Sequence, residues 1–306
     1  MPKTAYLFPG QGSQYVGMGL DLYTEYSSAK AVFDLADKVL RFPLSRLCFE
    51  GPEEDLALTK NAQPALLVTS IAALAAAREV AAEKMAEPDF MAGHSLGEYT
   101  ALAVAGALDF ETAVALSRER GQLMYSVGLK KPGAMAAILG LCKETIEEIC
   151  SETEVFIANI NCPGQTVISG VKENLAKATA LAKERGAKFA VKLNVSGAFH
   201  SPLMEHAAAS LNQHITKANI SVPNTPVIGN TMSQVLKTVE NVRDELLNQI
   251  CSCVRWEDTV RYMISQGVNR FVEIGPGDVL TGLIGRISSD VTSINIGSCE
   301  DIKAMV

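Results

Sequence analysis

The sequence predicts an α/β protein in which a large domain with a parallel sheet is interrupted by a small inserted unit. Short apolar runs alternate with alanine-rich, helix-like segments towards both ends of the chain. Between residues 134 and 194 the alternation becomes tighter and follows the order β-α-β-β-α-β. We therefore expect residues 1–127 and 198–306 to form the large domain, and residues 128–197 to form a ferredoxin-like insertion.

The N-terminal third is expected to contain two strands and three helices. Residues 4–8 form a short apolar run, and a Gly-rich turn leads from it into an amphipathic stretch over residues 18–40. Alanine-rich composition predicts helices over residues 64–87 and 96–107. The apolar run at residues 90–92, between these two helices, is expected to be a central strand of the parallel sheet.

The remaining elements follow from the same alternation of short apolar and helical segments. Within the insertion we expect strands at residues 134–140, 155–161, 165–170 and 187–194, and helices at 143–152 and 172–186. After the insertion we expect helices at residues 202–217 and 242–250 and strands at 226–228 and 270–274. These last four elements return to the texture of the large domain.

Charge and hydropathy exclude two classes of partner. The net charge is −7, and no run of Lys and Arg supplies a footprint for a phosphate backbone, so nucleic acid is not expected. The apolar stretch at residues 62–77 is interrupted by Gln63 and Pro64 and runs into Arg78, which indicates a buried helix and not a membrane span. Because no signal-peptide pattern is visible either, we expect a soluble, cytoplasmic protein.

The cysteines give no sign of a metal site. There are seven of them, an odd number scattered along the chain, as is typical of reduced thiols in a cytosolic protein. Cys251 and Cys253 form a Cys-X-Cys pair, but no second Cys or His pair lies at zinc-like spacing. We therefore expect no bound metal.

A GxSxG sequence, Gly93-His94-Ser95-Leu96-Gly97, provides the candidate nucleophile. It lies after a short apolar strand and before an alanine-rich helix, which is the context of a nucleophile elbow in an α/β-hydrolase-like domain. There the serine oxygen is presented at a helix N-terminus, where free N–H groups stabilise an oxyanion. The alternative is a serine that only caps a helix in a glycine-rich turn.

The candidate general base is found by comparing four histidines. The side chain of His94, next to the serine, is expected to diverge from it at the sharp turn. His206 and His214 lie on a predicted helix with mixed neighbours, as is typical of a solvated or half-buried face. His200 lies in a loop between the insertion and that helix, where functional loops tend to lie, so it is our candidate base, against a purely structural loop histidine.

Five motifs together resemble the malonyl-CoA:acyl carrier protein transacylases, over nearly the whole chain. Acyltransferase domains of polyketide and fatty acid synthases share most of them. In order along the chain, the motifs are Gly10-Gln11-Gly12-Ser13-Gln14, Gly93-His94-Ser95-Leu96-Gly97-Glu98-Tyr99, Arg120-Gly121, Gly197-Ala198-Phe199-His200-Ser201 and Glu273-Ile274-Gly275-Pro276-Gly277.

The resemblance implies a role for each matching position. It implies that Ser95 is acylated and that His200 is its base. The backbone N–H groups of Gln11 and Leu96 are implied to form an oxyanion hole. The guanidinium of Arg120 is implied to bind the free carboxylate of the malonyl group, although Arg118-Glu119-Arg120 alone looks like an exposed helical charge cluster.

Three further positions follow from the same resemblance. A main-chain carbonyl orients the histidine in this family, and Gln249 matches that position, although the Cys251-Ser252-Cys253 sequence after it departs from the family pattern. Gln63 matches a position that lines the pocket, against a simple polar residue near a helix N-terminus. Phe199 is expected to line the pocket and to exclude branched acyl groups.

The implied activity is ping-pong transfer of malonyl from coenzyme A to the phosphopantetheine thiol of acyl carrier protein, an S-malonyltransferase reaction that needs no cofactor. We expect a monomer that serves fatty acid synthesis. The alternatives are an acyltransferase of a polyketide synthase, a serine hydrolase or thioesterase, and a carrier-protein-binding scaffold. A hydrolase of this fold predicts a late acid and then a histidine, yet no histidine follows His214.

Overall fold

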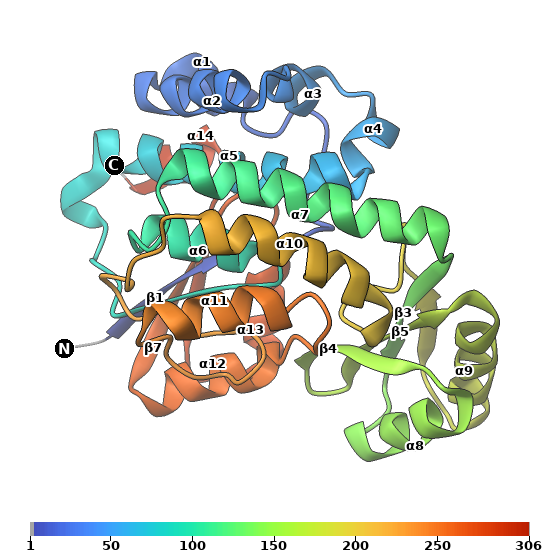
Figure 1. Cartoon of the computed structure of the whole chain (residues 1–306). Helices are drawn as coiled ribbons and strands as arrows, with labels where there is room; N and C mark the ends of the chain where they lie inside the picture. Colours follow the sequence, from blue (N-terminus) through green and yellow to red (C-terminus); the bar gives the residue numbers. More distant parts are fainter. Residues whose placement is uncertain (1–2, 306) are drawn as a thin grey trace.

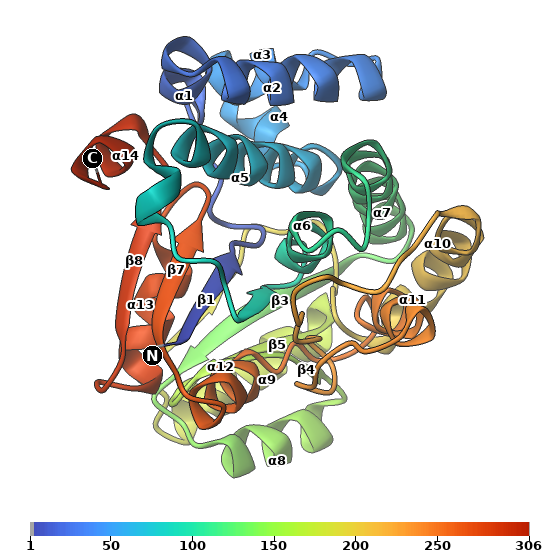
Figure 2. The same cartoon turned by 90° about the vertical axis from the view of Figure 1, so that its left-hand side faces the viewer.

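The computed structural model describes residues 3–305 and contains two separate four-stranded sheets (Figure 1). The first sheet is entirely parallel. Its order is β2 (Phe90–Gly93), β1 (Lys3–Phe8), β7 (Val268–Ile274) and β8 (Thr292–Ile296). In Figure 2, β1, β7 and β8 run side by side beneath the long helix α5 (Thr59–Ala81).

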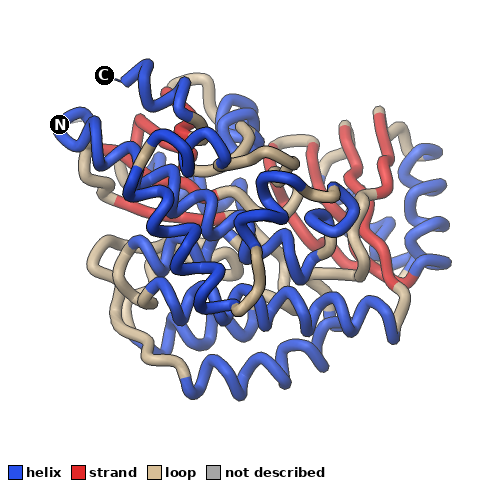
Figure 3. Tube along the Cα trace, turned by 90° about the horizontal axis from the view of Figure 1, so that it is seen from above, coloured by secondary structure: helices blue, strands red, loops and turns tan. Residues whose placement is uncertain are grey.

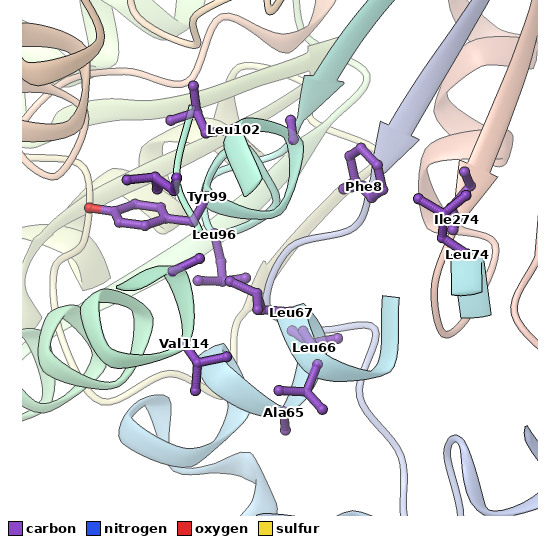
Figure 4. Close-up of a cluster of buried hydrophobic side chains, with 14 of the residues drawn as sticks. Phe8, Ala65, Leu66, Leu67, Leu74, Leu96, Tyr99, Leu102, Val114 and Ile274 are labelled. Atoms are coloured by element: carbon purple, nitrogen blue, oxygen red, sulfur yellow. The ribbon is translucent and has the colours of Figure 1, made fainter. Parts of the chain in front are cut away.

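Both faces of this parallel sheet are covered, as the apolar sequence of its strands requires. Tyr6 and Phe8 of β1 join the larger core cluster on one face, whereas Ala5 and Leu7 join a second cluster on the other. The larger cluster includes Phe8, Leu66, Leu67, Leu96 and Ile274, which Figure 4 shows converging between the strands, α5 and α6 (Gly97–Val104).

The helices form layers around this sheet. The N-terminal helices α1, α2 and α3 lie in an outer layer over α5 (Figures 1 and 2). The helices of the large part of the chain are α1 (Leu20–Glu25), α2 (Ser27–Leu40), α3 (Leu44–Glu50), α4 (Glu53–Ala57), α5, α6 (Gly97–Val104), α7 (Phe110–Lys130), α10 (Glu205–Lys217), α11 (Val239–Asn248), α12 (Trp256–Ser265), α13 (Val279–Ile287) and α14 (Cys299–Met305). Short 3-10 helices lie at Ala82–Lys84 and Pro202–Met204.

The second sheet is antiparallel and has the order β4 (Phe156–Cys162), β5 (Gln165–Val171), β3 (Gly133–Leu139) and β6 (Phe189–Lys192). Helices α8 (Lys143–Thr153) and α9 (Lys172–Glu184) share a core cluster with it. Figure 3 shows the two groups of strands apart from each other. The strand order and the β-α-β-β-α-β sequence confirm the ferredoxin-like unit, while its boundaries at 127/128 and 197/198 stay a prediction.

Three expectations about individual elements are wrong. Residues 226–228 form no strand and make only isolated bridges, Met91 to Val227 and Ile228 to Val235. The strand at 90–93 lies at one end of the parallel sheet and not at its centre, because the segment at 226–228 adds only a single bridge, Met91 to Val227, before the chain turns away. The helix expected over 18–40 is broken at Tyr26, whose backbone is extended (φ −120°, ψ 125°) between α1 and α2.

Helix α5 is the apolar stretch that was expected to be buried. It continues into the short 3-10 helix, and together they are long and apolar enough to cross a membrane by length and composition alone. However, 67% of the most apolar window is buried inside the protein. That burial is typical of the core helix of a soluble protein.

Candidate active site

Ser95 occupies a sharp turn between β2 and α6. Its φ of +52° lies in the left-handed region, which is strained for a residue with a side chain. The flanking glycines allow a close approach of the backbones. A Cβ on Gly93 would lie 1.9 Å from the carbonyl carbon of Gly97, and one on Gly97 would lie 2.0 Å from the Phe8 oxygen. The GxSxG sequence therefore has the geometry of a nucleophile elbow.

Ser95 and His200 lie in direct contact. Ser95 Oγ is 2.8 Å from His200 Nε2, and His200 Nδ1 is 2.8 Å from the main-chain oxygen of Gln249. Because a carbonyl oxygen only accepts, Nδ1 carries the hydrogen, and Nε2 of the neutral ring is free to accept the serine proton. The arrangement is that of a nucleophile, a base and an orienting group.

The environment keeps His200 neutral. Its side chain is buried, and desolvation together with the nearby Arg120 cation lowers the pKa of His200 to about 3. Within the described residues, the side chains of the other three histidines make no hydrogen bond to Ser95. His94 turns away to Asn161, with 2.9 Å between Nε2 and Oδ1, and His206 and His214 lie exposed on α10.

Arg120 is buried, contrary to the appearance of its local sequence, and is only 1% exposed. Its guanidinium donates to Gln63 Oε1 at 2.8 Å, to Gln249 Oε1 at 2.7 Å and to Ser95 Oγ at 3.1 Å. All three acceptors are neutral, and within residues 3–305 no ion pair includes Arg120. Its Nε also has no partner there. A buried cation without a counter-ion is a site for an anionic ligand.

A cavity of about 250 Å³ opens in front of Ser95 and His200, between the two sheets. The predicted residues Gln11, Leu96, Gln63, Arg120 and Phe199 all line it. Within the described chain, neither the Gln11 N–H nor the Leu96 N–H donates a hydrogen bond, so both are available to an oxyanion. The structure brings every predicted position together, because the Gln249 carbonyl meets His200 Nδ1 as expected. The Gln249 side chain contacts Arg120 and Ser95.

Several residues at this site have no counterpart in the sequence predictions. Asn230 holds the elbow, because its Oδ1 accepts from the Ser95 N–H and its Nδ2 donates to the Gly93 oxygen, both at 2.8 Å. Asn159 and Asn161 line the cavity from β4. Glu98 is buried and follows the GxSxG motif directly, so its place in the sequence GHSLGE could have marked it as part of the site. Nothing in the local sequence marks Asn230 in the same way.

Arg118 also differs from its expected surface role. Pro64 lies inside α5 and lacks the N–H that would bond the Lys60 carbonyl one turn earlier. Arg118 Nη1 donates to that carbonyl at 2.7 Å, and its guanidinium lies over the Phe42 ring. Arg118 therefore braces the start of α5.

The comparisons with known proteins agree with this geometry. Residues 5–296 match the acyl transferase domain family. The chain is 46% identical to the malonyl CoA-acyl carrier protein transacylase of Bacillus subtilis (strain 168), covering 100% of this chain and 97% of that protein.

Solved structures show the same fold. A malonyl CoA-acyl carrier protein transacylase from Coxiella burnetii superposes with a TM-score of 0.95 at 39% identity, covering 99% of this chain and 96% of that one. A malonyl-transacylase solved in complex with its type II PKS acyl-carrier protein gives a TM-score of 0.94 at 39% identity, covering 99% and 98%. The chain belongs to the acyl transferase domain family and, within it, to the malonyl CoA-acyl carrier protein transacylases.

Proposed function

We propose that this protein transfers the malonyl group of malonyl-CoA to the phosphopantetheine thiol of acyl carrier protein, through an acyl ester on Ser95. The observation that carries the proposal is the buried Arg120 guanidinium, 3.1 Å from Ser95 Oγ. Only one methylene separates the carboxylate of a malonyl group from its thioester carbonyl. A cation that binds this carboxylate while the serine attacks must therefore lie within a few ångströms of the nucleophile.

The acylation step uses the groups in contact with Ser95. Ser95 Oγ attacks the thioester carbon, and its proton passes to His200 Nε2. The N–H groups of Gln11 and Leu96 stabilise the oxyanion of the tetrahedral intermediate. The C–S bond then breaks, and the His200 proton goes to the sulfur of coenzyme A.

Deacylation runs the same steps in reverse with a different thiol. His200 takes the proton of the phosphopantetheine thiol, the sulfur attacks the ester, and Ser95 recovers its proton. Ester and thioester are at the same oxidation level, so the proposed reaction needs no redox group. His200 is oriented by a carbonyl, whereas the serine hydrolases considered above use an acid in that place.

We further propose that the protein acts as a cytoplasmic monomer in fatty acid synthesis. Ser95, His200, Arg120 and Gln249 all come from one chain, so a single copy holds the complete set. Phe199 is buried at the cavity wall, as expected of a residue that limits branched acyl groups.

Intact-mass measurement after brief mixing tests the proposed reaction. With malonyl-CoA the protein should gain the mass of one malonyl group, and with acetyl-CoA it should gain little. Adding holo acyl carrier protein should return the enzyme to its original mass and add the malonyl group to the carrier. Loss of the label to water at the same rate without carrier would instead indicate a hydrolase.

A further inference from the structure

Asn230 is completely buried beside the nucleophile, and all its polar groups are hydrogen-bonded. Its carboxamide joins the two sides of the elbow, accepting from the Ser95 N–H and donating to the Gly93 carbonyl, each at 2.8 Å. Its main-chain oxygen accepts from the Arg255 N–H at 2.9 Å, and its main-chain N–H donates to Glu98 Oε2 at 2.8 Å.

The side chain of Asn230 replaces a bond of the sheet. The Met91 N–H donates to the Pro226 oxygen, and the Met91 oxygen accepts from the Ile228 N–H; these two bonds form the single parallel bridge between Met91 and Val227. If that register continued for two more residues, the Asn230 main-chain N–H would donate to the Gly93 oxygen. That N–H is instead taken by Glu98, and the carboxamide supplies the missing donor while its oxygen reaches the Ser95 N–H.

A second amide holds the other side of the nucleophile. Gln249 Nε2 donates to the Ser95 main-chain oxygen at 2.9 Å. Ser95 therefore has both its N–H and its C=O bonded by buried side-chain amides while its φ is +52°. An unfavourable backbone conformation persists only where its surroundings fix it. These two hydrogen bonds help to do so here, beside the Glu98 N–H, which also donates to the Ser95 oxygen at 3.2 Å.

Buried carboxyl groups in turn fix Asn230. Glu245 Oε1 accepts from the Thr231 N–H at 2.8 Å, and a Cβ on Gly229 would lie 2.8 Å from the Glu245 carboxyl carbon. Burial, and then the proximity of Glu245, raises the pKa of Glu98 well above its usual value. Two titratable groups lie around Asn230: Glu98 on α6 and Glu245 on α11. Arg255, whose main-chain N–H donates to the Asn230 oxygen, forms an ion pair with Asp258.

We propose that Asn230 is a positioning residue for acyl transfer, whose carboxamide fixes the main chain of Ser95 so that Oγ meets both His200 and the thioester. The proposal rests on Ser95 being the nucleophile, as argued above. Asn230 does not touch the cavity, so it acts through Ser95 and not on the substrate. Its loss should therefore slow acylation while leaving the affinity for malonyl-CoA, which Arg120 provides, nearly unchanged.

The test compares Asn230→Ala, Asn230→Asp and a control, Asn295→Asp, by quenched-flow mass measurement of Ser95 acylation. Asn295 Nδ2 also donates to main-chain carbonyls, of Gly275 and Gly277, but in a different turn. Asn230→Ala should lower the acylation rate constant roughly 100-fold, the effect of a nucleophile misplaced by about 1 Å, with KM within about threefold of wild type. Asn295→Asp should acylate within about threefold of wild type.

Asn230→Asp separates positioning from packing, because it keeps the shape of the side chain. When ionised, its carboxylate only accepts, so the Gly93 carbonyl loses its donor. When protonated, it again offers one donor and one acceptor. Its rate relative to wild type should recover about 10-fold or more between about pH 8 and about pH 6, since burial beside two carboxyl groups raises its pKa.

Three results would overturn the proposal. The first is acylation within about threefold of wild type by both Asn230 variants. The second is a folded Asn230→Asp whose rate stays in constant ratio to wild type across this pH range. The third is failure of both variants to fold, which would assign Asn230 to stability alone. Absence of a label on Ser95 in the wild-type protein would instead refute the proposed function, so the two failures are distinguishable.

Discussion

Arg120 and His200 flank the same serine oxygen, and the charge of one sets the basicity of the other. The guanidinium contributes to the low pKa of His200, second only to burial. A malonyl carboxylate bound to Arg120 would neutralise that charge and make His200 a stronger base. The base would thus gain strength when a dicarboxylic substrate occupies the cavity.

This environment predicts an unusual pH profile. A base whose pKa is lowered on folding stays neutral until the pH falls through the lowered value, which for His200 is about 3. We expect kcat/KM for malonyl-CoA, which reports the free enzyme, to stay level from about pH 8 down to about pH 5. An acid limb with a midpoint near the ordinary histidine value of about 6.5 would contradict this account.

Removal of Arg120 should separate two substrates. Loss of one partner of a buried, hydrogen-bonded charge pair costs roughly 2–5 kcal/mol. At about 1.4 kcal/mol per tenfold, Arg120→Ala should lower kcat/KM for malonyl-CoA roughly 30- to several-thousandfold. Acetyl-CoA has no carboxylate, so its turnover should fall little or even rise.

The control for Arg120→Ala is Arg46→Ala, because Arg46 lies on the surface with its side chain 75% exposed. Arg118→Ala is unsuitable, since Arg118 braces the start of α5. Steady-state kinetics with both acyl-CoA substrates decide the matter. An equal loss for both substrates would make Arg120 a structural residue.

At the scale of elements, the elbow depends on the close approach of β2, α6 and the end of β1. Gly97→Ala would place a Cβ 2.0 Å from the Phe8 oxygen, and backbone atoms cannot move aside cheaply. We expect it to lower the free energy of unfolding by about 3 kcal/mol or more, at or above the usual cost of overpacking.

The control is the same substitution in another helix. A Cβ on Gly282, in α13, meets nothing within 4 Å. Gly282→Ala should therefore be neutral or stabilise by up to about 1 kcal/mol. Urea unfolding of both variants tests the pair, and equal stabilities would refute the close-packing argument.

The buried carboxyl groups that join α6 to α11 should make stability depend on pH. Glu98 has a raised pKa in the folded state, so its contribution is present below its unfolded value and is lost as the pH rises. Glu98→Gln keeps the acceptor for Asn230 but cannot ionise. Its stability relative to wild type should increase between about pH 5 and about pH 8 in urea unfolding. A pH-independent difference would show that Glu98 is not forced to stay neutral.

The elements that the sequence predicted well are those set by local pattern. The inserted unit is the clearest case, since α8 and α9 are amphipathic and their strands are separated by short turns. Elements that depend on contacts between residues far apart in the sequence were harder to predict from the sequence. β8 is a mostly half-exposed edge strand and was missed, as were α12, α13 and α14.

The same distinction holds for the candidate site. Ser95 and His200 were found because a motif and a count of four histidines sufficed. Arg120 needed the family resemblance, because its hydrogen-bond partners Gln63 and Gln249 lie 57 and 129 residues away in the sequence. Asn230 was not found at all, since its importance lies in a sheet register that only the folded chain reveals.

At the scale of the whole molecule, the two sheets together form the cavity. The elbow, Gln11 and Arg120 come from the large part of the chain, while Met135, Asn159 and Val167 of the antiparallel sheet close the opposite wall. In the proposed reaction, a small acyl group would lie between the two sheets. Ser95, His200 and Arg120, the proposed nucleophile, base and carboxylate site, all line this cavity.

In the proposed reaction, Ser95 carries the malonyl group during transfer. Intact mass after brief mixing with malonyl-CoA tests it most directly, comparing wild type with Ser95→Ala at matched fold and melting temperature. We predict one malonyl group on the wild-type protein, located on Ser95 by peptide mapping, and none on the variant. A malonyl label that persists on Ser95→Ala, or a wild-type label on another residue, would contradict the account.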